Sequence, residues 1–124
     1  MTLERNKRIV SQFFDEFLIG HNVKILDECL RPNYIQHNPL IADGKQGLIL
    51  FFQEYWEKYN PTYDVKRILA EKDLVAIHYH YKRNAGEKGM AIVDIFRLEN
   101  GKLVEHWDVV QPLPQKSEND HPLF

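Results

Sequence analysis

The feature that most constrains the fold is a change in the spacing of apolar residues halfway along this 124-residue chain. Up to residue 59, apolar side chains recur every three or four positions, as along one side of a helix. From residue 62 to residue 111 they alternate with polar ones, as in strands with one buried face. Helices first and strands afterwards are typical of an α+β fold, in which the helices cover one face of a sheet.

Three helices are predicted in the first half, over residues 3–19, 23–30 and 46–58. Thr2 is a suitable N-cap for the first, and Pro32 prevents continuation of the second. The segment Tyr34–Pro39 is too short and too polar for a helix, so it is predicted to be extended and to run into a turn. Helical structure should therefore be interrupted here by one extended stretch.

Four strands are predicted in the second half, over residues 62–70, 74–83, 89–98 and 102–111. Their connections are so short that they can join only antiparallel neighbours. We expect a strongly curved antiparallel sheet that forms a cone with the three helices and encloses an apolar pocket. Residues 1–124 are expected to form one domain, with an irregular, proline-containing tail over residues 112–124.

Charge and composition restrict the partners. Sixteen basic residues stand against 18 acidic ones and are scattered, so neither nucleic acid nor an anionic membrane is expected as a partner. The N-terminus lacks the apolar run of a secretion signal, and no apolar stretch approaches the roughly 20 residues that cross a bilayer. Cys29 is the only cysteine, which excludes an internal disulfide, and it is predicted to be a core residue. A cytoplasmic location is therefore expected.

The final hairpin decides which ionisable side chains share a face. We expect a three-residue loop at Glu99–Gly101, which places Asp94 opposite His106. Asp108 then lies on the same face, among apolar neighbours. A two-residue loop would instead place Asp94 opposite Trp107. The first register is preferred because it groups the ionisable side chains.

Asp94 and Asp108 are the main catalytic candidates. A carboxyl group that is surrounded by apolar side chains loses its hydration, which favours the protonated form and suits a proton donor or a base. The alternative is that both carboxylates face water or pair with a cation, namely Arg97, Lys82 or Arg83.

Histidines provide further candidates. His37 lies in the segment before the third helix and could act as a base, because histidine titrates near neutral pH; alternatively, it caps a turn. His78 and His80 lie on one face of a strand and could supply half of a metal site. No other cluster has metal-ligand spacing, so no metal is expected, and the pair is interpreted as lining of the pocket mouth or as part of an exposed sheet face.

Two segments carry a resemblance to a known family. Ala91–Asp108 resembles the C-terminal hairpin of SnoaL-like proteins, and Tyr34–Pro39 followed by Asp43-Gly44 and a helix is similar to their first half. With the order of elements, the chain resembles the nuclear transport factor 2-like superfamily. That superfamily includes polyketide cyclases, ketosteroid isomerase, limonene epoxide hydrolase and scytalone dehydratase, and many relatives that bind ligands without chemistry.

The resemblance also suggests roles for individual positions. Asp94 matches the acid in the oxyanion hole of ketosteroid isomerase, and Asp108 matches the catalytic acid on the last strand of limonene epoxide hydrolase. The general-base aspartate of the isomerase is replaced by Asn38, and its tyrosine donor aligns near Phe13. The isomerase mechanism in that form is therefore not expected, and His37 could serve as the base instead.

The resulting hypothesis is a SnoaL-like enzyme that acts next to the carbonyl group of a small apolar molecule. Asp108 would be the acid or base, Asp94 or His106 would stabilise the enolate oxygen, and His37 would assist from the loop. This chemistry needs no cofactor, and cyclisation of the aldol type, isomerisation, dehydration and hydrolysis remain open. The residues expected to bind the ligand are Phe13, Phe17, Tyr34, Phe52, Trp56, His78, His80, Phe96 and Val110.

Two other functions are consistent with the same residues. One is a ligand-binding domain without catalysis, because the argument for a pocket does not depend on proton transfer. The other is a domain that acts through dimerisation. A homodimer through the sheet face is expected from the resemblance, with Trp107, which lies on the face opposite to Asp108, as its anchor.

Overall fold

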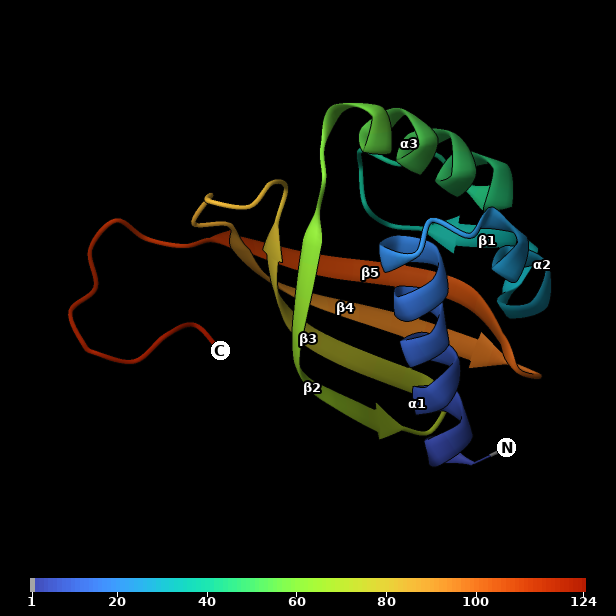
Figure 1. Cartoon of the computed structure of the whole chain (residues 1–124). Helices are drawn as coiled ribbons and strands as arrows, with labels where there is room; N and C mark the ends of the chain where they lie inside the picture. Colours follow the sequence, from blue (N-terminus) through green and yellow to red (C-terminus); the bar gives the residue numbers. More distant parts are fainter. Residues whose placement is uncertain (1) are drawn as a thin grey trace.

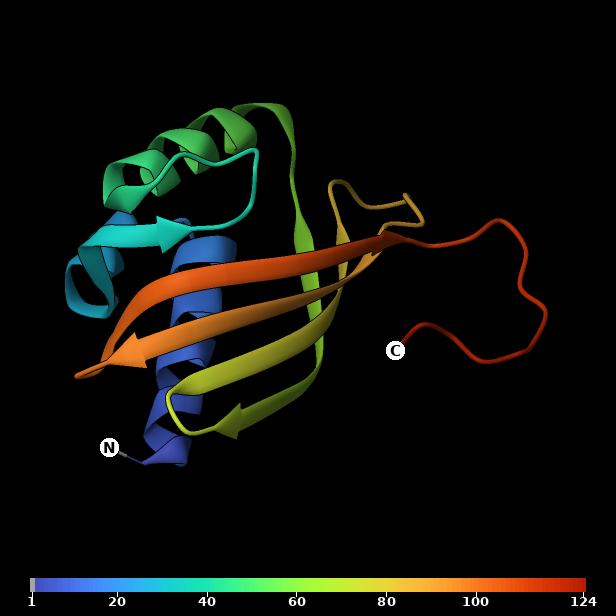
Figure 2. The same cartoon turned by 180° about the vertical axis from the view of Figure 1, so that it is seen from behind.

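The computed structural model describes residues 2–124 and has the predicted α+β architecture, in which helices cover one face of a curved, open sheet (Figures 1 and 2). The elements follow in the order α1 (Leu3–Gln12), η1 (Phe13–Ile19), η2 (Val23–Ile25), α2 (Leu26–Cys29), β1 (Leu30–Gln36), α3 (Gly44–Lys58), β2 (Thr62–Glu71), β3 (Leu74–Lys82), β4 (Met90–Glu99) and β5 (Lys102–Pro112).

The helices agree with the predicted ranges, with two differences in detail. The first helix has the predicted extent, but it changes from α-helical α1 to the wider π-helical η1 at Phe13. Its N-cap is Thr2, whose hydroxyl oxygen accepts a hydrogen bond of 3.1 Å from the backbone nitrogen of Arg5. The second helix is shorter than predicted, because Leu30 already belongs to a strand.

The sheet has five strands rather than four, in the order β1-β5-β4-β3-β2. The extra strand is β1, which pairs in parallel with β5, so the expectation of a purely antiparallel sheet is wrong. Short hairpins enforce antiparallel pairing only among β2 to β5, whereas β1 is linked to β2 through helix α3. Because β1 is an edge strand, it tolerates Pro32, which could not bond within a central strand.

The turn of the final hairpin also differs from the prediction. Asn100 and Gly101 have φ angles of 50° and 78°, and Glu99 pairs with Lys102. Two successive residues with positive φ are the signature of a tight two-residue hairpin loop, which Asn-Gly favours. The predicted three-residue loop is therefore wrong.

A β-bulge nevertheless keeps the ionisable residues on one face. Leu98 pairs with Leu103, whereas the next pair is Arg97 with Glu105, so Val104 is an extra residue in β5. The extra residue shifts the register by one position beyond the turn. Asp94, His106 and Asp108 therefore share one face as predicted, but Asp94 lies opposite Asp108 instead of His106.

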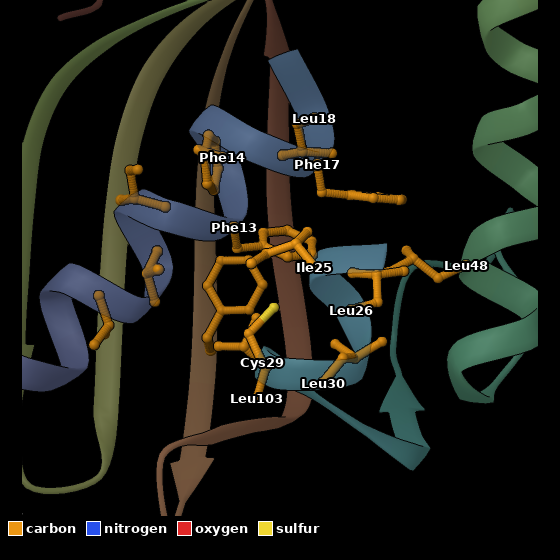
Figure 3. Packing of buried hydrophobic residues seen from close by; sticks show 14 of the residues in the cluster. Phe13, Phe14, Phe17, Leu18, Ile25, Leu26, Cys29, Leu30, Leu48 and Leu103 are labelled. Atoms are coloured by element: carbon orange, nitrogen blue, oxygen red, sulfur yellow. The ribbon is translucent and has the colours of Figure 1, made fainter. Parts of the chain in front are cut away.

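The core lies between the helices and the concave face of the sheet. Figure 3 shows Cys29 within it, beside Leu30 and Leu103. Its side chain is buried, and burial raises the pKa of the thiol to about 11. The predicted placement of Cys29 in the core is confirmed.

We expect Cys29 to react with iodoacetamide only after unfolding, because the thiolate is the reactive species and about one thiol in a thousand is ionised at pH 8 when the pKa is near 11. The measurement is the rate of labelling at pH 8 with and without urea, followed by mass spectrometry. Equal rates in the folded and unfolded states would contradict this placement.

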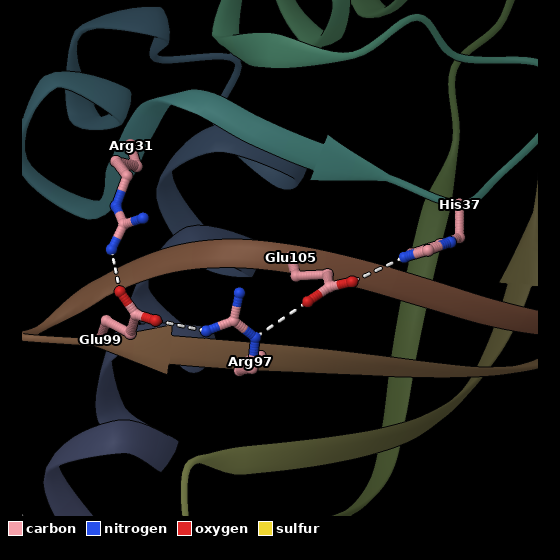
Figure 4. Close-up of polar contacts among 5 residues, drawn as sticks. All are labelled: Arg31, His37, Arg97, Glu99 and Glu105. Carbon is pink, nitrogen blue, oxygen red and sulfur yellow. Dashed lines mark hydrogen bonds and ion pairs between the residues drawn. The ribbon is translucent and has the colours of Figure 1, made fainter.

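The outer, convex face of the sheet carries an ionic chain of five side chains, shown in Figure 4: Arg31, Glu99, Arg97, Glu105 and His37. Glu105 is central, because it accepts a hydrogen bond of 2.8 Å from Arg97 Nε and contacts His37 Nε2 at 2.7 Å. These two partners, His37 first, lower the pKa of the Glu105 carboxyl. The chain links β1 to the β4–β5 hairpin.

The lowered pKa of Glu105 gives a pH dependence of stability with a definite sign. Its stabilising contribution is fully present above the unfolded pKa of about 4.3 and is lost as the pH falls through the lower folded pKa. We expect Glu105→Gln to be less stable than the wild type between pH 5 and 6, and the difference to shrink below about pH 4. Urea unfolding at a series of pH values measures this; a difference that grows on acidification would contradict it.

The chain beyond β5 is irregular, as predicted, although Pro112 still belongs to the strand. The segment leaves the end of β5 and turns back toward the sheet (Figures 1 and 2). The ring of Phe124 lies 4.6 Å from that of His80 and 5.8 Å from that of His78.

Within residues 2–124, no helix is both long enough and apolar enough to span a membrane.

Candidate active site

A cavity of about 480 Å³ lies between the helices and the concave face of the sheet. Its wall is mostly apolar, which is typical of small-molecule sites. Eight residues that the sequence singled out line it: Phe13, Tyr34, Phe52, Asp94, Phe96, His106, Asp108 and Val110. The two carboxyl groups and the imidazole among them come from β4 and β5.

Asp94, His106 and Asp108 form a compact acid–imidazole cluster on the cavity wall. Asp94 lies directly opposite Asp108 in the ladder. His106 Nε2 is 3.1 Å from Asp94 Oδ1 and 3.9 Å from Asp108 Oδ2. Asp94 and His106 are buried, and the side chain of Asp108 is 16% exposed. The cluster thus lies in a largely dry interior, as the sequence predicted.

Two amide side chains from β1 and the loop after it complete this cluster. Gln36 Oε1 lies 2.7 Å from His106 Nδ1. Asn38 Nδ2 donates a hydrogen bond of 2.7 Å to Asp108 Oδ2. Both residues line the cavity, as does Tyr34. Residues 34, 36 and 38 share one side because side chains alternate along an extended segment.

The hydrogen bonds determine where His106 carries its protons. The backbone N–H of Asn38 donates to Gln36 Oε1 at 2.9 Å, so this atom of Gln36 is the carbonyl oxygen and only accepts. His106 Nδ1 must therefore be the donor toward Gln36. At 3.1 Å, a second proton must lie between His106 Nε2 and Asp94 Oδ1, because two facing lone pairs would repel each other. Asp94 and His106 thus hold one shared proton.

Tyr79 fixes the other side of Asp94. Its hydroxyl group donates a buried hydrogen bond of 2.8 Å to Asp94 Oδ2. Burial, followed by the charge of Asp94, raises the pKa of the Tyr79 hydroxyl well above its ordinary value, so this group remains a donor. Both carboxylate oxygens of Asp94 are therefore occupied.

Asp108 differs from Asp94 because one of its oxygens is free. Asn38 occupies Oδ2, whereas Oδ1 has no hydrogen-bond donor anywhere in the described range 2–124. The cluster therefore contains one carboxyl group that is bound on both sides and one that can still accept a proton from a ligand. The alternative pairing of these carboxylates with Arg97 is not found, since Arg97 binds Glu99 and Glu105 on the outer face.

The structure places His37 outside the cavity. Its ring stacks on Trp107 at 4.9 Å and contacts Glu105 on the outer face. This follows from alternation, because the neighbours of His37, Gln36 and Asn38, point inward. The expectation that His37 assists catalysis from the loop does not fit this position.

Four residues expected to bind the ligand also do not line the cavity. His78 and His80 lie on the outer face, because Tyr79 and Tyr81 alternate with them and take the inner one. Phe17 and Trp56 pack on each other at 5.3 Å between the helices, which is a core position.

The sequence analysis missed three residues of the site, Gln36, Asn38 and Tyr79. The sequence analysis considered Asn38 only at the position of a general base, a role that its amide group cannot fill. Strand alternation in Tyr34–Pro39 would have placed Gln36 and Asn38 on the side of Tyr34, opposite to His37.

The acid–imidazole cluster is also the one set of side chains in the described range that could ligate a metal ion. Its three ligand atoms lie within 4.8 Å of one another. A cation there would have to displace the proton between Asp94 and His106, so the hydrogen-bonded arrangement and metal binding exclude each other. The expectation of no metal stays a prediction.

Comparison with known proteins places the chain in a family. The family model described as SnoaL-like domain matches residues 10–106. The chain belongs to the SnoaL-like family. The match spans both segments on which the resemblance rested, up to His106. No curated protein matches this SnoaL-like chain.

Solved structures share its nuclear transport factor 2-like cone fold. A provisionally assigned ketosteroid isomerase from Kribbella flavida has a TM-score of 0.77 at 19% identity, covering 96% of this chain and 84% of the other. TsrD from Streptomyces laurentii has a TM-score of 0.73 at 18% identity, covering 89% and 90%. A provisionally assigned polyketide cyclase from Acidithiobacillus ferrooxidans has a TM-score of 0.71 at 16% identity, covering 89% and 91%.

Proposed function

We propose that this SnoaL-like chain is an enzyme that moves a proton next to the carbonyl group of a small apolar molecule. The observation that carries the proposal is the asymmetry between two opposing carboxyl groups in an apolar cavity. Asp94 is engaged through both of its oxygens, whereas Asp108 keeps Oδ1 free for a ligand.

Asp108 is the base in this proposal. Its Oδ1 takes a proton from the carbon next to the carbonyl group; the C–H electron pair forms a C=C bond, and the carbonyl π electrons move to the oxygen. The proton held between Asp94 and His106 leaves this buried pair without net charge, so the pair does not oppose the charge of the developing enolate. Asn38 orients Asp108 by its hydrogen bond to Oδ2.

The second step distinguishes three reactions. In isomerisation, protonated Asp108 returns its proton to a different carbon. In cyclisation of the aldol type, the enolate carbon attacks a second carbonyl group, and Asp108 protonates the resulting alkoxide. In dehydration, the enolate expels a β-hydroxyl group, which takes the proton from Asp108 and leaves as water. Hydrogen bonds to the enolate oxygen suffice for all three, so we expect no cofactor.

Proton exchange tests this function without knowledge of the natural substrate. The protein is incubated in D₂O with a panel of aromatic and alicyclic ketones, and ¹H NMR follows the loss of the protons next to each carbonyl group. We expect exchange faster than in buffer for at least one ketone that binds. Saturable binding across the panel without faster exchange would contradict catalysis and favour the ligand-binding alternative.

We further propose that two copies pair through the outer face of the sheet. This face presents Trp107 together with the exposed side chains of Leu69, 62% exposed, and Val109, 67% exposed. Sedimentation of the wild type should give a dimer, and Val109→Asp should shift it toward the monomer. A monomeric wild type at micromolar concentration would contradict this proposal.

A further inference from the structure

The cavity wall includes a hydroxyl group without a partner. Tyr34 on β1 is 1% exposed and lines the cavity, and its hydroxyl group makes no hydrogen bond to any residue in the range 2–124. A buried hydroxyl group without a partner is costly, so most of them are satisfied. The hydroxyl group of Tyr34 is therefore available to a ligand.

The acceptors of the acid–imidazole cluster already have partners within the protein. Each oxygen of Asp94 has one, Tyr79 or His106. Gln36 Oε1 already accepts from His106 Nδ1 and from a backbone N–H. The Tyr34 ring lies nearly parallel to that of His106, with the ring centroids 6.5 Å apart, so its position is fixed by packing.

The charge around Tyr34 keeps it protonated. Burial, and after it the charges of Asp94 and Asp108, raise the pKa of the Tyr34 hydroxyl well above its ordinary value. A phenol in this state can donate a hydrogen bond but is not a base. The cavity wall thus carries a free acceptor, Asp108 Oδ1, and a free donor, the Tyr34 hydroxyl group, close enough for the charge of the first to affect the second. Gln36 Nε2 is a further donor without a partner, but that atom is fully buried.

We propose that the Tyr34 hydroxyl group donates the hydrogen bond that holds the carbonyl oxygen of the ligand, and the enolate oxygen that develops from it. The inference rests on the proposed function and adds a catalytic residue to it. Removal of a proton next to a carbonyl group requires a base at the carbon and a donor at the oxygen. Asp108 on β5 is the base at the carbon, and Tyr34 on β1 is the donor at the oxygen.

The test uses a matched pair of probes, 2-acetylnaphthalene and 2-ethylnaphthalene, which differ in the carbonyl oxygen. We expect Tyr34→Phe to weaken binding of the ketone about three- to tenfold and to leave binding of the hydrocarbon unchanged. A ¹³C-labelled carbonyl group should show a stretching frequency that is lowered in the wild type and restored in the variant. A wild type that does not prefer the ketone, or a variant that binds both probes as the wild type does, would overturn the proposal.

Stability provides the second readout and a matched control. Tyr34→Phe removes a hydroxyl group that has no partner in the protein, so we expect its melting temperature to equal or exceed that of the wild type. Tyr79→Phe should lower it, because Asp94 loses a buried donor. A loss of stability in Tyr34→Phe as large as in Tyr79→Phe would show that the Tyr34 hydroxyl group is used within the protein and would overturn the proposal.

Tyr63 is the competing donor. It also lines the cavity without a hydrogen-bond partner in the described part of the chain, but it lies opposite Tyr81 in the β2–β3 ladder, near the hydroxyl pair of Tyr55 and Tyr81. We expect Tyr63→Phe to leave the preference for the ketone intact; loss of the preference there instead of in Tyr34→Phe would assign the role to Tyr63.

The two proposals can fail separately. If binding of the ketone depends on Tyr34 but its protons do not exchange faster than in buffer, catalysis is refuted and the role of Tyr34 as donor stands. If proton exchange is as fast in Tyr34→Phe as in the wild type, the role of Tyr34 as donor is refuted and the proposed enzyme function stands.

Discussion

Replacement of Asp108 by asparagine should lower the rate of ketone proton exchange by about 10²- to 10⁴-fold, which is the usual contribution of a general base. Asparagine has the same shape and keeps an oxygen that can accept the hydrogen bond from Asn38, so the cavity wall should be preserved. The amide cannot take up a proton. The measurement is the exchange rate by ¹H NMR for a ketone that the wild type processes.

The matched control for this prediction is Asp64→Asn. Asp64 is an exposed carboxylate on β2 that pairs with Lys66. Its replacement makes the same chemical change away from the cavity, and the exchange rate should remain that of the wild type. Equal rates for Asp108→Asn and the wild type would show that another group is the base.

Removal of the His106 side chain should have the largest effect on stability. In His106→Ala, Asp94 keeps its hydrogen bond from Tyr79 but loses the partner that shares its proton, in a position that is 5% exposed. Loss of one partner from a buried pair costs about 3–5 kcal/mol of the free energy of unfolding. Urea unfolding of both proteins at pH 7 measures the difference.

A double-mutant cycle separates the interaction energy between Asp94 and His106 from the effect of lost packing. Addition of Asp94→Asn to His106→Ala removes the unpaired charge, so the double variant should be more stable than the sum of the two single effects predicts. His121→Ala, in the exposed tail, is the control and should change stability by less than about 0.5 kcal/mol. Additive single effects would contradict the shared proton between Asp94 and His106.

The layout of the fold could be predicted from the sequence because two periodicities dominate it. The three-to-four-residue spacing and the alternation after residue 62 fixed the helices, the strands and the inner face that carries Asp94, His106 and Asp108. The exact ladder could not be predicted. A two-residue loop and a bulge at Val104 each shift the register by one, and no residue pattern marks where a bulge will form.

Strand β1 was missed for a different reason. It is short and contains Pro32, and its pairing with β5 is parallel and distant in sequence, so neither length nor a hairpin turn identifies it. In the sequence alone, His37 is the most reactive side chain of this segment and was selected for that reason. In the structure, the alternation of side chains along the strand turns His37 outward and brings Gln36 and Asn38 to the acid–imidazole cluster. The placement of His37 toward the cavity arose because alternation was not applied to the extended segment Tyr34–Pro39.

The central claim is that Asp94 and His106 share a proton while Asp108 remains a free base, and the ¹⁵N NMR spectrum of the His106 ring tests it most directly. The spectrum is recorded at pH 7 and assigned with His106→Asn. The hydrogen bond to Gln36 predicts a proton on Nδ1 that exchanges slowly with water. A ring in which Nδ1 is bare, or in which Nε2 neither carries a proton nor accepts one from Asp94, would contradict the proton arrangement on which the proposed chemistry depends.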